Sequence, residues 1–224
     1  MAGKVTIAII GGTGALGAGL AWRLAGAGHA ILIGSRSAEK AQAAANTLAA
    51  KATGARPRGA GNANAAKSAD IVFVTVPWAS HAAILDEIAP HVVGKLVVDT
   101  TVPLVPPRVA RVQLPPQGSA ALAAQERLGM GVRVASAFHN VAAHKLQQDE
   151  AIDCDVLVFA DEAKDRQAVL DLARDAGLRG IHAGPLANSV AAEALTSVLI
   201  GINRAYRVDG AGIRITGISG ISGT

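Results

Sequence analysis

The sequence predicts an α/β protein built on a doubly wound parallel sheet, and three observations lead to this class. Half of the 224 residues are hydrophobic but only 3% are aromatic, so the interior must be aliphatic, as where helices pack on a parallel sheet. Short apolar runs alternate with alanine-rich segments of helical spacing. The runs are apolar on both faces, which is typical of strands covered by helices on both sides.

The predicted strands are six apolar runs, and right-handed crossovers should join them. They are Val5–Ile10, Ala30–Ile33, Ile71–Val76, Leu96–Val98, Val132–Ala137 and Asp155–Phe159. Residues 103–118 interrupt the alternation with five of the nine prolines. A long ordered loop or linker is therefore expected there.

A smaller C-terminal α/β portion is expected after this loop. Helical spacing continues over 119–128, and residues 155–183 should form a strand, a helix and a further short strand. We divide the chain into a nucleotide-binding domain of residues 1–135 and a portion of residues 136–224. One long helix is predicted over 188–207, with Asn188 or Ser189 as its cap. Its apolar stripe should pack on the core or on a second subunit; the stripe is Leu195, Val198, Leu199, Ile202 and Tyr206. No function is assigned to the tail, residues 217–224.

Composition restricts the cellular compartment and the class of ligand that can be expected. A single cysteine, Cys154, excludes an internal disulfide and favours a reducing compartment, so a cytoplasmic location and a buried, inert thiol are expected. No membrane span is expected, since Glu193 and Thr196 interrupt the Val190–Ile202 run. The net charge of +4 is dispersed and aromatic residues are few, which favours anionic small molecules over nucleic acid.

A glycine-rich turn, residues 11–17, joins the first strand to a helix and predicts a dinucleotide site. In this fingerprint Gly12 permits the tight turn, Gly14 lets the backbone approach the pyrophosphate and Gly17 lets the helix lie close to the strand. The helix N-terminus then faces the anion. This Rossmann-type arrangement is preferred to a Walker loop, which needs Lys and Ser or Thr where Ala18 and Gly19 stand.

The end of the second strand indicates which nucleotide binds. NAD enzymes usually present an acidic residue there, but this chain has Gly34-Ser35-Arg36. Ser35, Arg36 and Lys40 instead supply donors and positive charge for a 2′-phosphate. The alternative is a solvated helix start; we predict NADP(H).

Two further strand ends should line the same crevice, because ligands bind outside the carboxyl ends of such strands. The first carries Thr75-Val76-Pro77-Trp78, in which Trp78 either walls the cofactor cleft or fills the core. The second carries Asp99-Thr100-Thr101-Val102.

Five segments, in order along nearly the whole chain, resemble the NADPH-dependent coenzyme F420 reductases. They are Gly11-Gly12-Thr13-Gly14, Gly34-Ser35-Arg36, Thr75-Val76-Pro77-Trp78, Ser136-Ala137-Phe138-His139 and Ala183-Gly184-Pro185-Leu186. The resemblance implies hydride exchange between NADP(H) and coenzyme F420, a 5-deazaflavin with an anionic tail. It implies NADP contacts at Thr13, Gly14, Ala15, Leu16, Ser35, Arg36, Lys40, Val76 and Val102, and second-ligand contacts at His139, Val141, Ala143 and Gly212.

This chemistry requires orientation rather than a protein nucleophile, because both reactive atoms belong to cofactors. A short-chain dehydrogenase would need Lys four residues after Tyr206, where Gly210 stands, and a hydroxyacid dehydrogenase of the long-helix type would need a lysine beyond Lys164. His139 is the expected catalytic residue, hydrogen-bonding the deazaflavin, unless it bonds a loop carbonyl. No metal is expected, since His144 lacks further ligands at useful spacing.

Two other classes stay open on the same nucleotide site. One is an NADPH-dependent reductase of an imine or related small molecule, and the other is a non-catalytic NADP(H) sensor. A homodimer through the helix over 188–207 is also expected.

Overall fold

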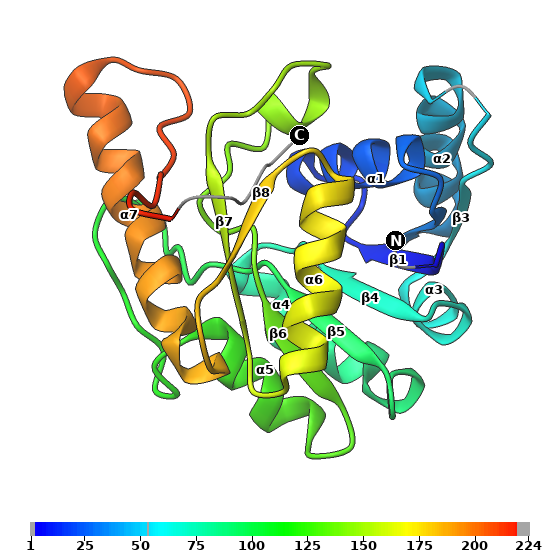
Figure 1. Cartoon of the computed structure of the whole chain (residues 1–224). Coiled ribbons are helices and arrows are strands. Elements are labelled where there is room, and N and C mark those ends of the chain that lie inside the picture. The colour runs from blue at the N-terminus through cyan, green and yellow to red at the C-terminus, as the bar shows by residue number, and fades with distance from the viewer. Residues whose placement is uncertain (1–2, 53, 219–224) are drawn as a thin grey trace.

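The computed structural model describes residues 3–52 and 54–218 and confirms the predicted α/β class. Its described residues form one sheet in the order β3-β2-β1-β4-β5-β6-β7-β8 (Figure 1). The strands are β1 (Thr6–Ile10), β2 (Ala30–Ser35), β3 (Arg58–Gly61), β4 (Ile71–Val74), β5 (Leu96–Asp99), β6 (Arg133–Ser136), β7 (Asp155–Ala160) and β8 (Arg179–His182).

Helices cover both faces of the sheet, as predicted for a doubly wound fold. Helices α1 (Ala15–Gly26), α2 (Ala38–Lys51) and α6 (Ala163–Asp175) share one apolar core with Ile7 and Ile9 of β1. Helices α3 (Asn62–Ser68), α4 (Trp78–Ile88) and α5 (Ala120–Leu128) share the other with Ala8 and Ile10. The alternation along β1 follows from the two-residue period of a strand.

Two features of the sheet differ from the sequence prediction. Strand β3 was not predicted, because its residues, Arg58-Gly59-Ala60-Gly61, form no apolar run. Strand β7 pairs with β6 antiparallel, through Ala135 opposite Ala160, so the sheet is not parallel throughout. The connection between them holds only a short 3-10 turn, η2 (Lys145–Gln147), and no crossover helix, and a parallel pair would need a crossover.

The long C-terminal helix is confirmed as α7 (Ser189–Tyr206), which follows a 3-10 turn, η3 (Leu186–Asn188). Asn188 is the N-cap residue, as predicted, but its side chain makes no capping bond and Nδ2 donates to the Ala183 carbonyl oxygen at 3.4 Å instead. The predicted stripe is only partly packed: Leu199 is buried, but Val198 is 45% and Tyr206 75% exposed. The inward face instead carries Ala192, Glu193 and Ser197.

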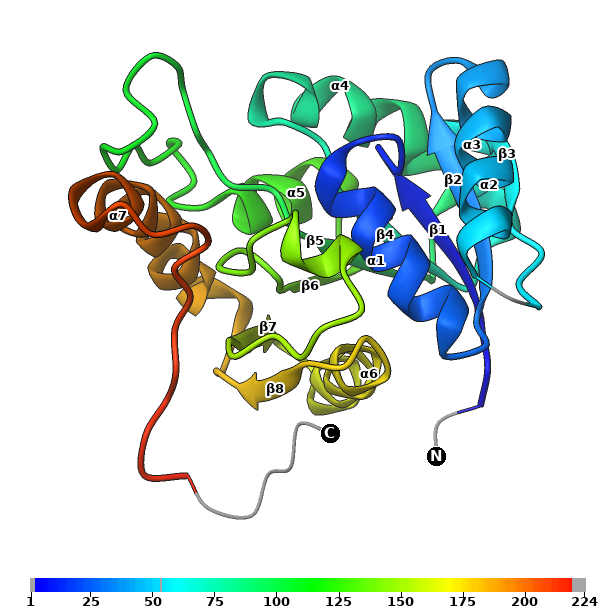
Figure 2. The ribbon, with the colours of Figure 1, turned by 90° about the horizontal axis from the view of Figure 1, so that it is seen from above.

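Helix α7 lies at the opposite edge of the molecule from α2 (Figure 2). By length and composition alone, Leu186–Tyr206 would be apolar enough to span a membrane, with a mean hydropathy of 1.3. The Glu193 carboxylate in its middle accepts hydrogen bonds from two backbone N–H groups at the start of α5. The helix is therefore docked on the protein through a polar contact.

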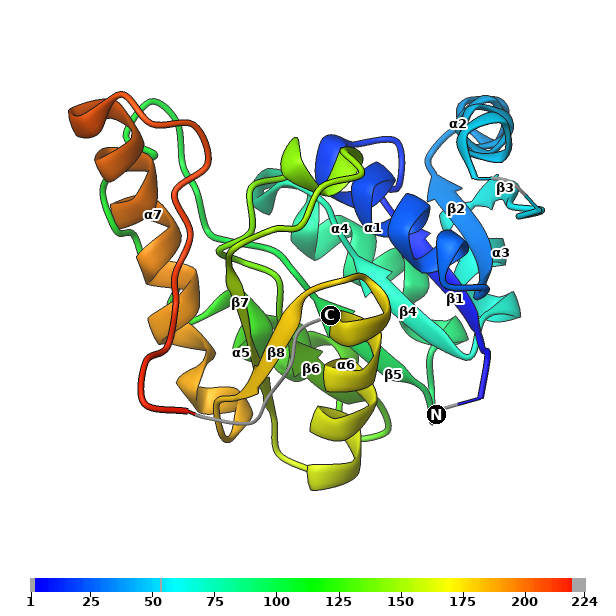
Figure 3. The ribbon, with the colours of Figure 1, turned by 45° about the horizontal axis from the view of Figure 1, so that its top comes forward.

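The proline-rich loop, residues 103–118, is free of helix and strand as predicted. It runs alongside α7 (Figure 3) and ends at Ser119, whose hydroxyl accepts a bond from Leu122 N at 3.0 Å and so caps α5. Of the tail, residues 219–224 lie outside the described residues.

Candidate functional site

The glycine-rich turn between β1 and α1 is closed tightly by backbone contacts. Gly11 rather than Gly12 adopts the positive φ, +82°, that the turn requires, which corrects the predicted position. A Cβ atom on Gly11 would lie 2.8 Å from the Thr75 carbonyl oxygen, and one on Gly12 would lie 2.8 Å from the Ile9 oxygen. Neither position accepts a side chain without movement.

The start of α1 is suited to an anion. Gly14 is the N-cap residue and supplies no side-chain cap, so no side chain occupies the first-turn N–H groups. A Cβ atom on Gly17 would lie 2.6 Å from Thr75 Oγ1 and 2.8 Å from Gly12 Cα. Gly17 therefore lets the helix lie against the strand ends, with its amino terminus facing the turn.

A cavity of about 180 Å³ lies beside this turn. It brings together six predicted residues: Thr13, Gly14, Ser35, Arg36, Val76 and Pro77. It also includes Gly11 and Thr75, from two of the predicted segments, and it adds Asn62, Ser80 and Ile84, which were not predicted. Asn62 Oδ1 is buried without a hydrogen-bond partner among the described residues, and an orphaned buried acceptor is a candidate ligand contact.

Positive charge surrounds the end of β2. Ser37 caps α2 by accepting a bond from Lys40 N at 3.2 Å, which fixes the first turn that carries Lys40. Arg36 and Lys40 are exposed, and neither is within 4 Å of a carboxylate of the described residues. Both cations are therefore available to a phosphate.

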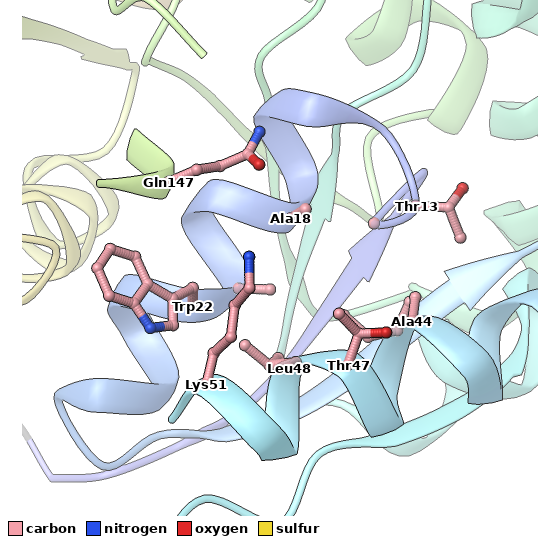
Figure 4. Close-up of a pocket in the computed structure, with 11 residues that line it drawn as sticks. Thr13, Ala18, Trp22, Ala44, Thr47, Leu48, Lys51 and Gln147 are labelled. Carbon is pink, nitrogen blue, oxygen red and sulfur yellow. The ribbon is translucent and has the colours of Figure 1, made fainter. Parts of the chain in front are cut away.

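A second cavity, of about 230 Å³, lies on the other side of the Gly12–Thr13 turn, between α1 and α2 (Figure 4). Its wall is mostly apolar, and Trp22 and Lys51 lie toward one end. Gly12 and Thr13 border it, but Ser35 and Arg36 do not. The two cavities therefore share Thr13 but not the residues at the end of β2.

His139 follows a strained turn at the end of β6. Phe138 has a φ of +68°, which is unfavourable for a bulky residue. The Phe138 ring is 1% exposed and lies 5.9 Å from the Phe73 ring, so core packing holds the turn. His139 Nε2 lies 2.9 Å from Ser136 Oγ. Among the described residues, neither ring nitrogen of His139 bonds a loop carbonyl oxygen, which was the alternative expectation.

The imidazole of His139 is neutral near pH 7. Burial lowers its pKa to about 4, and the charge of Asp99 opposes part of this change. Its Nδ1 atom is buried and has no hydrogen-bond partner among the described residues. With Nε2–H donating to Ser136, Nδ1 has a free lone pair for a ligand.

Helix α7 holds the turn that carries His139. Thr196 Oγ1 donates to the His139 carbonyl oxygen at 2.9 Å, and Asn140 Nδ2 donates to the Ala192 oxygen at 2.9 Å. The segment after α7 returns to the same place, because a Cβ atom on Gly212 would lie 2.7 Å from Cys154 Sγ. That sulfur contacts the Asn140 carbonyl oxygen at 3.4 Å.

Comparison with known proteins assigns the family. Residues 6–103 match the family model for NADP oxidoreductases that depend on coenzyme F420. The F420-dependent NADP reductase of Methanothermobacter marburgensis is 39% identical over 95% of this chain and 98% of its own length. The chain belongs to the F420-dependent NADP reductase family.

Two more similar proteins extend this comparison. The Methanothermobacter thermautotrophicus reductase is 40% identical over 95% of both chains. The solved structure of a candidate F420-dependent NADP reductase from Arthrobacter sp. FB24 superposes with a TM-score of 0.82, at 25% identity, over 95% of this chain and 99% of its own. The match therefore spans the whole fold of these reductases.

The structure does not gather all of the residues expected of such a reductase in one cavity. Trp78 lines a different cavity, of about 500 Å³, between α4 and α5. Val141 is buried, Ala143 and Val102 are half-buried, and Lys40 lies outside the 180 Å³ cavity. Ala15 and Leu16 likewise lie outside its lining.

Two further side chains, His144 and Cys154, lie apart from these cavities. His144 lies 3.3 Å from Asp209, and the described residues contain no group of His, Cys, Asp and Glu suited to a metal ion. Cys154 is buried, and burial raises the pKa of its thiol, as expected of an inert cysteine.

Proposed function

We propose that this chain transfers a hydride between NADP(H) and coenzyme F420. The observation that carries this function is the 39% identity with an F420-dependent NADP reductase over 95% of the chain. When bound, the nucleotide and the deazaflavin supply the chemistry: NADPH, a proton and oxidised F420 give NADP⁺ and reduced F420, or the reverse. The protein must bind and orient the two rings and exclude water.

The β1–α1 turn is the proposed pyrophosphate site. Gly12, Gly14 and Gly17 keep the turn compact, and the backbone of Thr13, Ala15 and Leu16 approaches the phosphates. Ser35, Arg36 and Lys40 are the proposed 2′-phosphate clamp, supported by two exposed cations without carboxylate partners. Val76, Pro77 and Val102 lie at strand ends toward which the nicotinamide would extend. For Trp78 we propose only a position beside this crevice, without a direct contact to the nucleotide.

The His139 turn is the proposed deazaflavin site. A neutral imidazole whose buried Nδ1 has no described partner can accept a hydrogen bond from the deazaflavin without adding charge. Val141, Ala143 and Gly212 are the proposed apolar contacts beside it. In this proposal residues 1–135 bind NADP(H), and residues 136–224 complete the second-ligand cleft.

Mixing the protein with NADPH and oxidised F420 should bleach the visible absorbance of the deazaflavin, and NADP⁺ with reduced F420 should restore it. His139→Ala should slow the exchange about tenfold or more, since a buried hydrogen bond is lost, while the Kd for NADPH stays nearly unchanged. His144→Ala is the matched control, because that half-exposed histidine pairs only with Asp209 among described residues.

Exchange in neither direction, despite tight NADPH binding, would contradict the assignment. Reduction of a cyclic imine by the same protein would then favour an imine reductase. NADPH-dependent capture of a partner protein without turnover would favour a sensor.

Assembly as a homodimer through α7 completes the proposal. The helix exposes Val198 and Tyr206, beside the half-buried Leu195 and Ile202, which is suitable for a twofold contact. A dimeric mass in light scattering should fall to that of a monomer in Val198→Glu. The proposed compartment is the cytoplasm, which suits a chain whose one cysteine cannot form an internal disulfide.

A further inference from the structure

A buried histidine–aspartate pair joins α4 to the end of β5. His81 lies in the first turn of α4, and Asp99 is the last residue of β5. Their side chains are 2% and 1% exposed, and His81 Nε2 lies 2.6 Å from Asp99 Oδ2. Because an ionised carboxylate only accepts hydrogen bonds, Nε2–H is the donor. This short contact fixes α4 against the end of the sheet.

Asp99 also holds the two segments that follow β5 and β6. Its second carboxylate oxygen, Oδ1, accepts a bond from Thr101 N at 2.9 Å, one residue before Val102. Its backbone oxygen accepts a bond from Ala137 N at 3.2 Å, two residues before His139. One residue therefore contacts both sides of the crevice proposed for the two cofactor rings.

Hydroxyl groups extend the connection to the end of β4. Thr100 Oγ1 donates to the Val74 oxygen at 2.9 Å, and Thr101 Oγ1 makes a longer contact of 3.4 Å with the Val76 oxygen. The backbones at Val76 and Val102, the two proposed nicotinamide neighbours, are thus connected through Asp99 and the threonines. Their separation is set by this network.

Filling this space with a buried polar pair is unfavourable in free energy. Burying two ionisable groups carries a desolvation cost, and well-packed apolar residues of similar volume often give equal or higher stability. The pair lies beneath the strand ends where the rings would meet. We therefore attribute to it the fixing of the positions of these strand ends, not an increase in stability. Hydride transfer is sensitive to geometry, since a displacement of about 1 Å can cost roughly a hundredfold in rate.

We propose that His81 and Asp99 are positioning residues for hydride transfer, which set the spacing of the Val76 and Val102 segments around the nicotinamide. This inference rests on the proposed function. It separates the two steps of the reaction: NADPH binding depends on the β1–α1 turn and the Arg36 region, whereas the rate of transfer depends on the buried pair.

The test is single-turnover bleaching of oxidised F420 by NADPH, and by NADPH deuterated at the transferred C4 hydrogen, in the folded full-length protein. His81→Leu should slow the transfer about tenfold to a hundredfold and make the isotope effect more temperature-dependent, with the NADPH Kd changed less than threefold. His81→Gln should restore most of the rate, because its amide Nε2 can donate from a similar position. If His81→Leu does not fold, Asp99→Asn carries the same expectation.

His29→Leu is the matched control. His29 is also buried and lies 2.9 Å from Asp175 Oδ2, but that pair joins the start of β2 to the end of α6. It should lower stability without changing the transfer rate or its isotope effect.

Wild-type rates in both His81→Leu and Asp99→Asn would overturn the inference, as would slow transfer that His81→Gln fails to restore or that His29→Leu matches. Absence of exchange in the wild-type protein would instead remove the proposed function, so the two failures are distinguishable.

Discussion

In the turn after β1 the proposed pyrophosphate contacts come from one continuous stretch of backbone, whereas in the turn after β6 His139 depends on side chains distant in sequence. A Cβ atom added to Gly11 or Gly17 would meet other atoms within 3 Å. His139, in contrast, is held by the hydroxyl of Thr196, 57 residues away. The first region thus requires the absence of side chains, and the second requires their presence.

Gly17→Ala should produce the largest effect and tests the first half of this comparison. The new methyl group would lie 2.6 Å from Thr75 Oγ1 and 2.8 Å from Gly12 Cα, so α1 must move away from the turn. Overpacking of this kind costs about 1–3 kcal/mol. We expect NADPH affinity to fall beyond detection by calorimetric titration, with a lower midpoint of thermal unfolding.

Gly26→Ala is the control on the same helix. Gly26 is the last residue of α1, and a Cβ atom there would meet nothing within 4 Å. The change should leave NADPH binding intact and stabilise the helix by up to about 1 kcal/mol. Equal NADPH affinity in Gly17→Ala and Gly26→Ala would show that close packing of the turn is not required.

Arg36→Ala tests whether one side chain near this backbone site decides which nucleotide binds. A hydrogen bond to a charged group contributes about 1.5–3 kcal/mol, or roughly ten- to a hundredfold in affinity. NADPH should therefore bind that much more weakly, whereas NADH, which lacks the 2′-phosphate, should change little. Arg58→Ala removes an exposed arginine from the neighbouring edge strand and should change neither. Equal weakening of both nucleotides by Arg36→Ala would refute the clamp.

The contrast between the regions also explains how much of the fold could be predicted from the sequence. Strands β1, β2, β4 and β5 are continuous apolar runs, and their parallel order follows from the connecting helices. Strand β3 has no apolar run because it lies at an edge. The direction of β7 depends on the chain between β6 and β7, where no periodic pattern marks the reversal.

The same limit applies to the candidate site. The turn at residues 11–17 was predictable because the residues that define the motif are adjacent in the sequence. The contacts of Thr196 with the His139 carbonyl and of His81 with Asp99 arise only when strand ends and helices meet in space. Asn62 was missed for this reason, since it reaches the cavity from the element that follows the unpredicted strand.

Glu193 tests the second half of the comparison, in which side chains from α7 secure the fold. Its carboxylate accepts bonds from Ala120 N at 2.6 Å and Ala121 N at 3.1 Å, at the start of α5. Glu193→Ala leaves both donors buried without this acceptor and should cost about 1–3 kcal/mol in urea unfolding. Glu162→Ala, at an α6 N-cap position whose side chain makes no capping bond, should cost little. Equal losses of unfolding free energy in the two variants would mean that the bonds from Glu193 to the start of α5 do not stabilise the fold.

The stability contributed by Glu193 should depend on pH. Burial raises its pKa to about 8 from a usual 4.5, and the two backbone N–H groups oppose this rise. Between these values the folded state binds more protons than the unfolded state, so the unfolding free energy should decrease as pH rises from about 4.5 to 8. Glu193→Gln should abolish this component of the pH dependence, measured as urea midpoints from pH 5 to 8.5. Parallel profiles for the two proteins would contradict it.

Ala44→Leu should have the smallest effect and probes the boundary of the nucleotide region. Ala44 faces the 230 Å³ cavity between α1 and α2, and a leucine there would bury up to three more methylene groups, at about 0.8 kcal/mol each before strain is subtracted. We expect a net gain near 1 kcal/mol, seen as a thermal midpoint about 2–4 °C higher. Ala49→Leu, at an exposed position of the same helix, should gain nothing. NADPH affinity should be unchanged in both variants, because the cavity lies on the other side of the Gly12–Thr13 turn from Ser35 and Arg36; a loss of affinity in Ala44→Leu alone would place part of the nucleotide in this cavity.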